Sequence, residues 1–97
     1  MRANIYEGLI NDRRRFVLVN DDMLLHIFDD PNWGYVGTGP AKVAEAILVN
    51  EFGCAVDRAL INDFLEQVVA KWPSRTGWKL TSQEIKEWEE KVEEIEE

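Results

Sequence analysis

The chain has 97 residues and a formal net charge of −8, with 45% hydrophobic and 31% charged residues. This composition excludes a disordered chain and is typical of one globular domain, which at this length needs no disulfide or metal to build a core. No stretch reaches the ~18 apolar residues that a membrane-spanning helix requires.

Three short β-prone runs in the N-terminal third predict an antiparallel meander. The runs are residues 5–10, 16–19 and 23–28, and two polar turns, 11–12 and 20–22, separate them. Asn and Asp suit such turns because both tolerate a left-handed backbone and bond their own backbone. The third run is short enough to form either a strand or a helical turn.

A glycine-rich segment, residues 33–40 with the sequence WGYVGTGP, leads into the first predicted helix. Its glycines permit positive φ angles or close backbone approach, and Pro40 suits a first helical turn because its missing N–H costs nothing there. We therefore predict a helix over residues 41–52, with Thr38 or Gly39 as its N-cap and Gly53 just after its end.

A second helix is predicted to start near Val56 or Asp57 and to end at Trp72, where Pro73 stops it. Its broad apolar face makes it the expected central core helix. Residues 78–80 then form a short extended piece.

The third helix is predicted to open with a capping box, in which Thr81 is the N-cap and Glu84 reaches back to it. Acidic residues at its negative end predict a frayed tail over residues 93–97. The whole chain, residues 1–97, is thus predicted to be one α+β domain: an antiparallel sheet of about three strands packed on two helices, with a third, acidic helix at the end.

Two stretches together resemble a known family: GYVGTGPAKVA at residues 34–44, and GWKLT at 77–81 with Glu84, Ile85 and Trp88. The resemblance is to small prokaryotic, phage-borne or plasmid-borne domains of unknown function. In these a Gly-Tyr-x-Gly-x-Gly-Pro loop precedes a helix and a Trp-x-Leu-Thr segment comes near the end. It covers roughly residues 33–88 and implies an accessory or mobile-element protein, without implying any catalytic residue.

The glycine-rich loop is the candidate ligand site. A helix N-terminus presents free N–H groups and a partial positive charge, which suits phosphate, so Gly37, Thr38, Gly39 and Lys42 are the candidate anion-binding residues. The segment lacks the Gly-Lys-Ser/Thr of a P-loop and the third glycine of a dinucleotide fingerprint. The alternative is a tight turn that only lets Trp33 and Tyr35 tuck against the helix.

Acidity is concentrated in residues 21–56, with a net charge of −5, and in residues 81–97, with −6. Such a field repels nucleic acid and anionic membranes, and it favours a basic protein partner. The candidate interaction surface is the outer face of the third helix together with a tryptophan, a residue enriched at interfaces. Its members are Glu89, Glu90, Glu93, Glu94 and Trp78. The alternative is that the charge serves solubility alone.

Catalysis, metal binding and cofactors find little support. His26 is the only imidazole and is predicted to be partly buried, while Cys54 follows a helix C-terminus, where the dipole disfavours a thiolate. A single cysteine, with no signal peptide, predicts a cytoplasmic protein. The run of Arg13, Arg14 and Arg15 is expected to alternate between strand faces rather than form one patch. We therefore predict a non-enzymatic interaction or regulatory module, with a small-ligand or anion-binding domain as the alternative.

Overall fold

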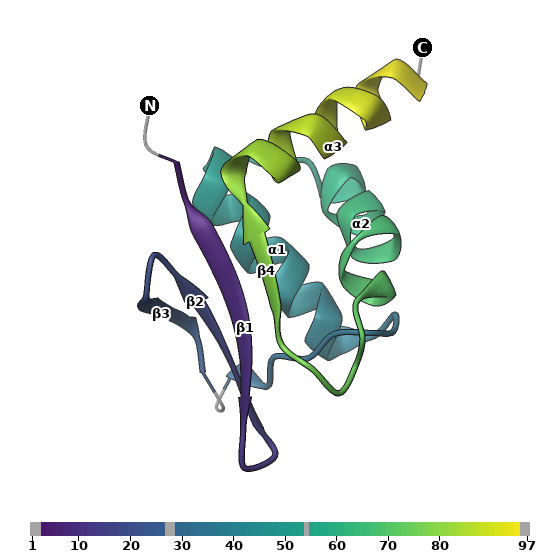
Figure 1. Cartoon of the computed structure of the whole chain (residues 1–97). Coiled ribbons are helices and arrows are strands. Elements are labelled where there is room, and N and C mark those ends of the chain that lie inside the picture. Colours follow the sequence, from purple (N-terminus) through teal and green to yellow (C-terminus); the bar gives the residue numbers. More distant parts are fainter. Residues whose placement is uncertain (1–2, 27–28, 54, 96–97) are drawn as a thin grey trace.

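The computed structural model describes residues 3–26, 29–53 and 55–95, with side chains up to Val92. In this part of the chain a four-stranded antiparallel sheet lies against the helices (Figure 1). In chain order, the elements are β1 (Ile5–Asn11), β2 (Arg14–Val19), β3 (Asp22–Leu25), α1 (Thr38–Phe52), α2 (Arg58–Gln67), the 3₁₀ turn η2 (Val69–Lys71), β4 (Trp78–Thr81) and α3 (Ser82–Ile95). No helix among the described residues is long and apolar enough to cross a membrane.

The meander predicted for the N-terminal third is confirmed. β1 pairs with β2 and β2 with β3, both antiparallel. The two hairpin turns place Asp12, Arg13, Asn20 and Asp21 at φ angles of 51°, 68°, 52° and 70°. Two successive positive φ angles match the right-handed twist of the flanking strands. The third run is a strand as far as Leu25, and its residues 27 and 28 lie outside the described residues.

The sheet has one strand more than the sequence predicted. The extended piece before the last helix is β4, which pairs antiparallel with β1 and gives the strand order β3-β2-β1-β4. In this register Tyr6 lies opposite Leu80, and Gly8 lies opposite Trp78. Local sequence pattern cannot reveal this pairing, because it joins segments from opposite ends of the chain.

The first two helices differ from the prediction at their ends. α1 begins at Thr38, one turn early, with Gly37 as its N-cap. The Asp57 side chain caps α2 as predicted and accepts the Ala59 N–H at 3.1 Å. α2 itself ends at Gln67 instead of Trp72, and η2 continues the chain from there. The Val69 carbonyl in η2 accepts the N–H of Gly34 at 3.1 Å, so the glycine-rich loop is bonded to the end of this helical segment.

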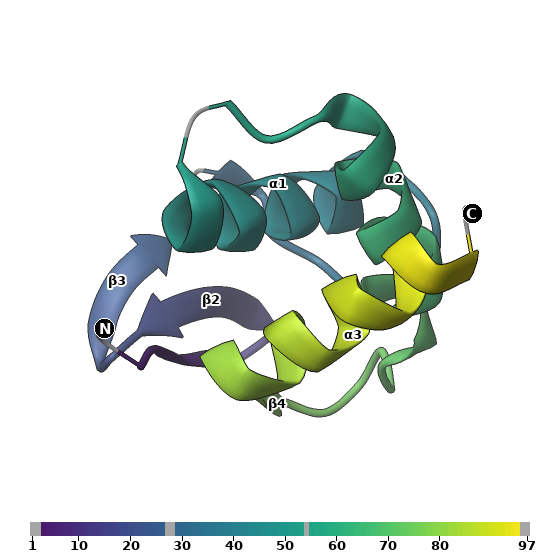
Figure 2. The same ribbon diagram turned by 90° about the horizontal axis from the view of Figure 1, so that it is seen from above.

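The capping box of α3 is confirmed in both directions. The Glu84 N–H donates to the Thr81 hydroxyl oxygen at 3.2 Å, and the Thr81 N–H donates to Glu84 Oε1 at 3.1 Å. Seen from above, α3 runs from the end of β4 to the side of α2 (Figure 2). There Trp88 packs edge-on against Phe64, with ring centroids 4.9 Å apart, and its Nε1 donates to Gln67 Oε1 at 3.0 Å.

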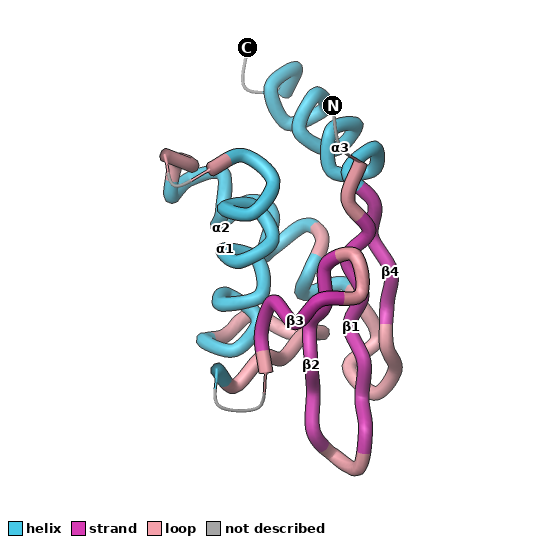
Figure 3. The backbone as a smooth tube through the Cα atoms, turned by 90° about the vertical axis from the view of Figure 1, so that its left-hand side faces the viewer, coloured by secondary structure: helices cyan, strands magenta, loops and turns pink. Residues whose placement is uncertain are grey.

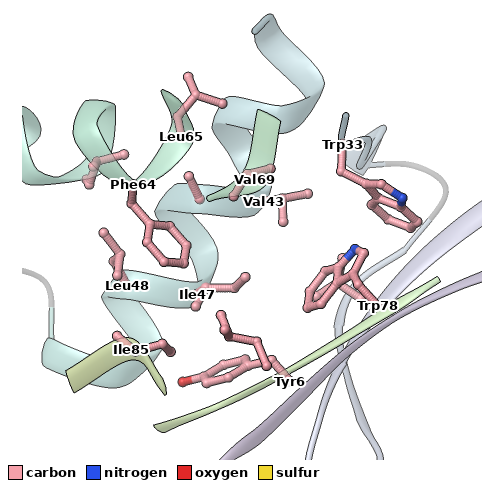
Figure 4. Close-up of a cluster of buried hydrophobic side chains, with 14 residues drawn as sticks. Tyr6, Trp33, Val43, Ile47, Leu48, Phe64, Leu65, Val69, Trp78 and Ile85 are labelled. Carbon is pink, nitrogen blue, oxygen red and sulfur yellow. The ribbon is translucent and has the colours of Figure 1, made fainter. Parts of the chain in front are cut away.

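The core fills the space between the helices and one face of the sheet (Figure 4). α1 contributes Val43, Ile47 and Leu48, and α2 contributes Phe64 from the centre of its apolar face. Figure 3 shows the helices on one side of the strands, with no described element over the other side. The sheet therefore has an inner face that belongs to the core and an outer face without cover.

Candidate functional site

The glycine-rich loop is built for close packing. Gly34 has a φ of 90°, which glycine tolerates. Gly39 has no positive φ, but a Cβ there would lie 2.8 Å from the Cβ of Asn32 and 3.1 Å from the Asp30 carbonyl oxygen. Trp33 is fully buried, and its Nε1 donates to the Thr76 carbonyl at 2.9 Å. The loop thus ties the start of α1 to the segment before β4.

The four candidate anion-binding residues do not share one hollow. No side chain caps the N-terminus of α1, and Thr38 is exposed there. Lys42 lines a hollow of about 400 Å³ between β3 and α1, with Leu25, Asp29, Glu45, Ala46 and Val49, and neither Gly37 nor Gly39 borders it. The geometry favours the packing alternative for the buried Trp33, whereas Tyr35 is exposed, contrary to that alternative. Anion binding at this loop stays a prediction.

Trp78 does not belong to an exposed interaction surface, so this part of the prediction is wrong. Its side chain is only 8% exposed. It stacks on Trp72 at a centroid distance of 4.0 Å and meets Trp33 edge-on at 5.7 Å. β4 directs it to the inner face, because alternate strand residues point to opposite faces and Trp78 pairs with the inward-facing Gly8. Figure 4 shows Trp78 beside Trp33 at one end of the core.

The acidic residues of α3 are only partly on its open surface. Glu90 is exposed, whereas Glu89 is half-buried. The side chains of Glu93 and Glu94 lie outside the described residues. Exposed Lys86 and Lys91 stand among these acids, so the described part of the helix does not present a purely acidic face.

Of the two residues considered for catalysis, the structure describes only His26. His26 is exposed rather than partly buried, and its Nε2 lies 3.7 Å from Asp29 Oδ2. His26 follows the last residue of β3, Leu25, and so lies outside the sheet, which explains its exposure. Cys54 lies outside the described residues. Within the described chain no three His, Cys, Asp or Glu side chains come close enough to hold a metal ion.

A polar network that the sequence analysis missed joins β1, α1 and α3. Glu51 Oε1 accepts hydrogen bonds from Asn4 Nδ2 at 3.1 Å, the Tyr6 hydroxyl at 2.8 Å and the Ser82 hydroxyl at 2.9 Å. Asn50 Nδ2 donates to the Tyr6 hydroxyl at 2.9 Å. Burial, reinforced by the Glu51 carboxylate, raises the pKa of Tyr6 to about 12.

This network borders a hollow of about 440 Å³ whose other walls include Phe52, Gln83, Lys86 and Glu89. The members of the network are bonded to one another and come from three parts of the chain: the start of β1, the end of α1 and the start of α3. Its geometry is that of a clamp that fixes the start of β1 and of α3 to the end of α1.

The outer face of the sheet is the most unusual surface of the molecule. It carries five apolar side chains that are absent from the core cluster: Ile5, Leu9, Phe16, Leu18 and Met23. Ile5 is 52% exposed, Leu9 39% and Met23 54%. We call these five residues the outer-face patch.

Strand register makes the patch continuous across three strands. Leu9 on β1 lies opposite Phe16 on β2, and Leu18 on β2 lies opposite Met23 on β3. Directly opposed side chains on one face are close enough to touch, so Leu9, Phe16, Leu18 and Met23 form one apolar surface, and Ile5 lies beyond Glu7 on the same face of β1. An antiparallel sheet with one solvated face normally alternates apolar and polar residues, and the central strand β2 does not follow that rule.

The apolar run in β2 is the feature of the sequence that indicates this surface. Phe16, Val17, Leu18 and Val19 form an uninterrupted apolar run, and such a run is typical of a strand covered on both faces. In the structure Val17 and Val19 meet the core, while Phe16 and Leu18 face away from it. Only the position of the helices shows which half of the run lacks a cover.

Comparison with known proteins found one relationship. No curated protein and no solved structure matches the chain. A family model described as a family of unknown function, DUF6166, matches residues 11–91, a span that holds β2, β3, α1, α2, β4 and most of α3.

 Within that span lie three residues of the patch, Phe16, Leu18 and Met23, whereas Ile5 and Leu9 precede it. The resemblance stated above predicted a family of unknown function, and this is confirmed, while a mobile-element origin stays a prediction. Since the match covers most of the sequence, the chain belongs to this family of unknown function.

Proposed function

We propose that the protein is a protein-interaction module whose docking surface is the outer face of its sheet. The observation that carries the proposal is the outer-face patch, an apolar surface across three strands with no described element over it. Exposed apolar surfaces of this kind mark sites of protein association, because water favours their removal. The proposal keeps the interaction role expected from the sequence and moves the surface from α3 to the sheet.

The occupant we propose is a second copy of the chain, stacked sheet against sheet. Most acidic residues of the chain belong to helices and loops, and the acidic residues of the strands are Glu7 and Asp22, of which Asp22 pairs with the core-facing Val19. By strand alternation, the outer face carries one acidic residue, Glu7, and two basic ones, Arg14 and Lys79. Two copies can therefore stack without bringing their acidic helices into contact, because the helices lie on the other side of the sheet, and the apolar side chains of two sheets then form a sandwich interior.

The size of the face sets the expected strength of this dimer. Four strands about 4.8 Å apart, the longest of seven residues at about 3.4 Å each, span roughly 19 by 24 Å. That is about 450 Å² of flat area per copy, below the ~800 Å² per partner of standard stable complexes. We therefore expect a reversible dimer that forms as the concentration rises, rather than an obligate one.

Sedimentation equilibrium from about 1 μM to about 1 mM protein tests the proposal, over a range that brackets weak association. The native chain should shift from monomer to dimer with concentration, and added salt should strengthen the dimer by screening the repulsion between two chains of charge −8. Leu9→Lys and Met23→Lys should remain monomeric, because each would bury a charge in the contact.

Val36→Lys is the matched control, because Val36 is an exposed apolar residue, 62% accessible, in the loop before α1 and away from the sheet. It makes the same change in charge at another place and should dimerise like the native chain. All variants are first compared by circular dichroism to confirm folding. A native chain that stays monomeric throughout, or a Val36→Lys variant that dissociates like Leu9→Lys, contradicts the proposal.

A further inference from the structure

A small polar hollow at one end of the sheet brings together the three consecutive arginines. Its walls are formed by Arg13, Arg14, Arg15, Asp30, Pro31 and Asn32, and its volume is about 150 Å³. Arg13 belongs to the β1–β2 turn, whereas the other two start β2. Arg14 and Arg15 still alternate between the two faces of the sheet as expected, and all three arginines border the hollow because it lies at the end of the sheet beside the segment before α1.

The positive charge of this hollow is not neutralised within the described chain. None of the three arginines lies within 4.0 Å of a carboxylate among the described residues, although the chain has 19 acidic residues. Asp30 borders the hollow without forming such a pair. Asn32 Oδ1 accepts the Trp33 N–H at 2.9 Å, which leaves the Asn32 amide group as a further donor.

Arg15 is held in place and yet incompletely bonded. Its guanidinium carbon lies 5.5 Å from the centre of the Trp33 ring, and its Nη2 donates to the Ser74 carbonyl at 2.7 Å. Its Nε is buried and has no hydrogen-bond partner among the described residues. Buried donors normally have a partner, so this nitrogen calls for an acceptor that the described chain does not supply.

We propose that this arginine hollow binds a compact oxyanion of the phosphate type, either free phosphate or the terminal phosphate of a small molecule. The planar guanidinium group of arginine matches the oxygens of phosphate in geometry and charge. The small volume of the hollow suits a single phosphate group. A nucleic acid strand is disfavoured, because the chain as a whole carries a charge of −8. This site differs from the glycine-rich loop and is independent of the outer-face patch.

Titration with inorganic phosphate, followed by the backbone amide resonances of the protein, tests the site. Phosphate should shift the resonances of residues 13–15 and 30–32 in a saturable manner, and chloride at equal ionic strength should not. Arg13→Gln and Arg14→Gln should each weaken the affinity for phosphate roughly tenfold, as expected for the loss of one charge-assisted hydrogen bond. A second titration with phosphoserine distinguishes a phosphate monoester from free phosphate as the preferred ligand.

The matched control is Arg75→Gln, which removes an exposed arginine that does not line the hollow. It should bind phosphate as the native chain does. The monomeric variant Met23→Lys should also bind, which separates this site from the proposed dimer. Shifts that chloride reproduces, equal losses in Arg75→Gln and Arg14→Gln, or tighter binding of a short DNA duplex at the same residues would overturn the proposal.

Discussion

At Gly8 the sheet makes room for the indole ring of Trp78 on the neighbouring strand. A Cβ at this position would overlap with Nε1 and Cε2 of the Trp78 indole. The indole cannot easily move away, because Trp72 stacks on it and Trp33 meets its edge. The absence of one side chain in β1 is thus matched to the size of a side chain in β4.

Gly8→Ala should therefore lower the free energy of unfolding by about 1–3 kcal/mol, the usual range for overpacking a core. Urea unfolding followed by circular dichroism measures this loss. In the double variant Gly8→Ala with Trp78→Leu, the smaller side chain makes room for the new methyl group. The loss of stability in the double variant should therefore be smaller than the sum of the losses in the two single variants. Strictly additive losses would mean that the two residues do not press on each other.

Tyr6 couples the polar network to pH. Its pKa rises from the ordinary value of 10.0 to about 12, mainly because it is buried. Because the pKa is higher in the folded state, at a pH between 10 and 12 the folded protein keeps the proton of the Tyr6 hydroxyl while the unfolded chain loses it. The contribution of Tyr6 to the free energy of unfolding is fully present below pH 10 and is lost as the pH rises towards 12.

A Tyr35→Phe variant leaves Tyr6 as the only tyrosine, so phenolate absorbance then reports on one residue. We expect a titration midpoint near 12 in the folded variant and near 10 in denaturant. The stability of this variant should fall over the same interval of pH. A folded midpoint near 10 would show that the hydroxyl is not buried as described.

At the scale of elements, the two hairpin turns differ in backbone strain, because different residue types occupy their positions with positive φ. Both use positive φ at two successive residues, and the second of these is Arg13 in one turn and Asp21 in the other. Aspartate relieves a left-handed backbone by local hydrogen bonds, whereas arginine does not. Glycine is the preferred residue at such positions.

Arg13→Gly should thus stabilise the fold by roughly 1 kcal/mol, and Asp21→Gly should stabilise it by less, since left-handed backbone costs ~1–2 kcal/mol for an ordinary residue. Thermal unfolding of both variants ranks the effects. Arg13→Gly also removes a wall of the arginine hollow, so it should lose phosphate affinity while the fold becomes more stable. If Arg13→Gly destabilises the protein, the turn geometry described here is wrong.

The elements that local chemistry controls could be predicted from the sequence. Thr81 and Glu84 form the predicted capping box, and Asp57 caps α2, because each bond spans only two or three residues. The end of α2 could not be predicted, since the Val69 carbonyl bonds to Gly34 in a distant loop. β4 was visible as an extended piece, but its pairing with β1 depends on contacts across the whole chain.

At the scale of the whole molecule, the sites depend on how the layers stack. The acidic residues and Trp78 were chosen from composition and position, yet Trp78 is in the core and Glu89 is half-buried. The outer-face patch arises because the helices that contribute to the core lie on the same side of the sheet (Figure 3). The apolar run at residues 16–19 indicates that both faces of this strand are apolar. Only the tertiary structure shows which of the two faces the helices leave uncovered.

The most direct test of the central claim is a dilution series of the methyl-labelled protein followed by nuclear magnetic resonance. If two copies meet through their sheets, the methyl resonances of Ile5, Leu9, Leu18 and Met23 should move together as the concentration falls. The methyl resonances of Val36, which is exposed elsewhere, should stay in place. Patch resonances that do not change with concentration, or changes confined to Val36 and its neighbours, would contradict the account.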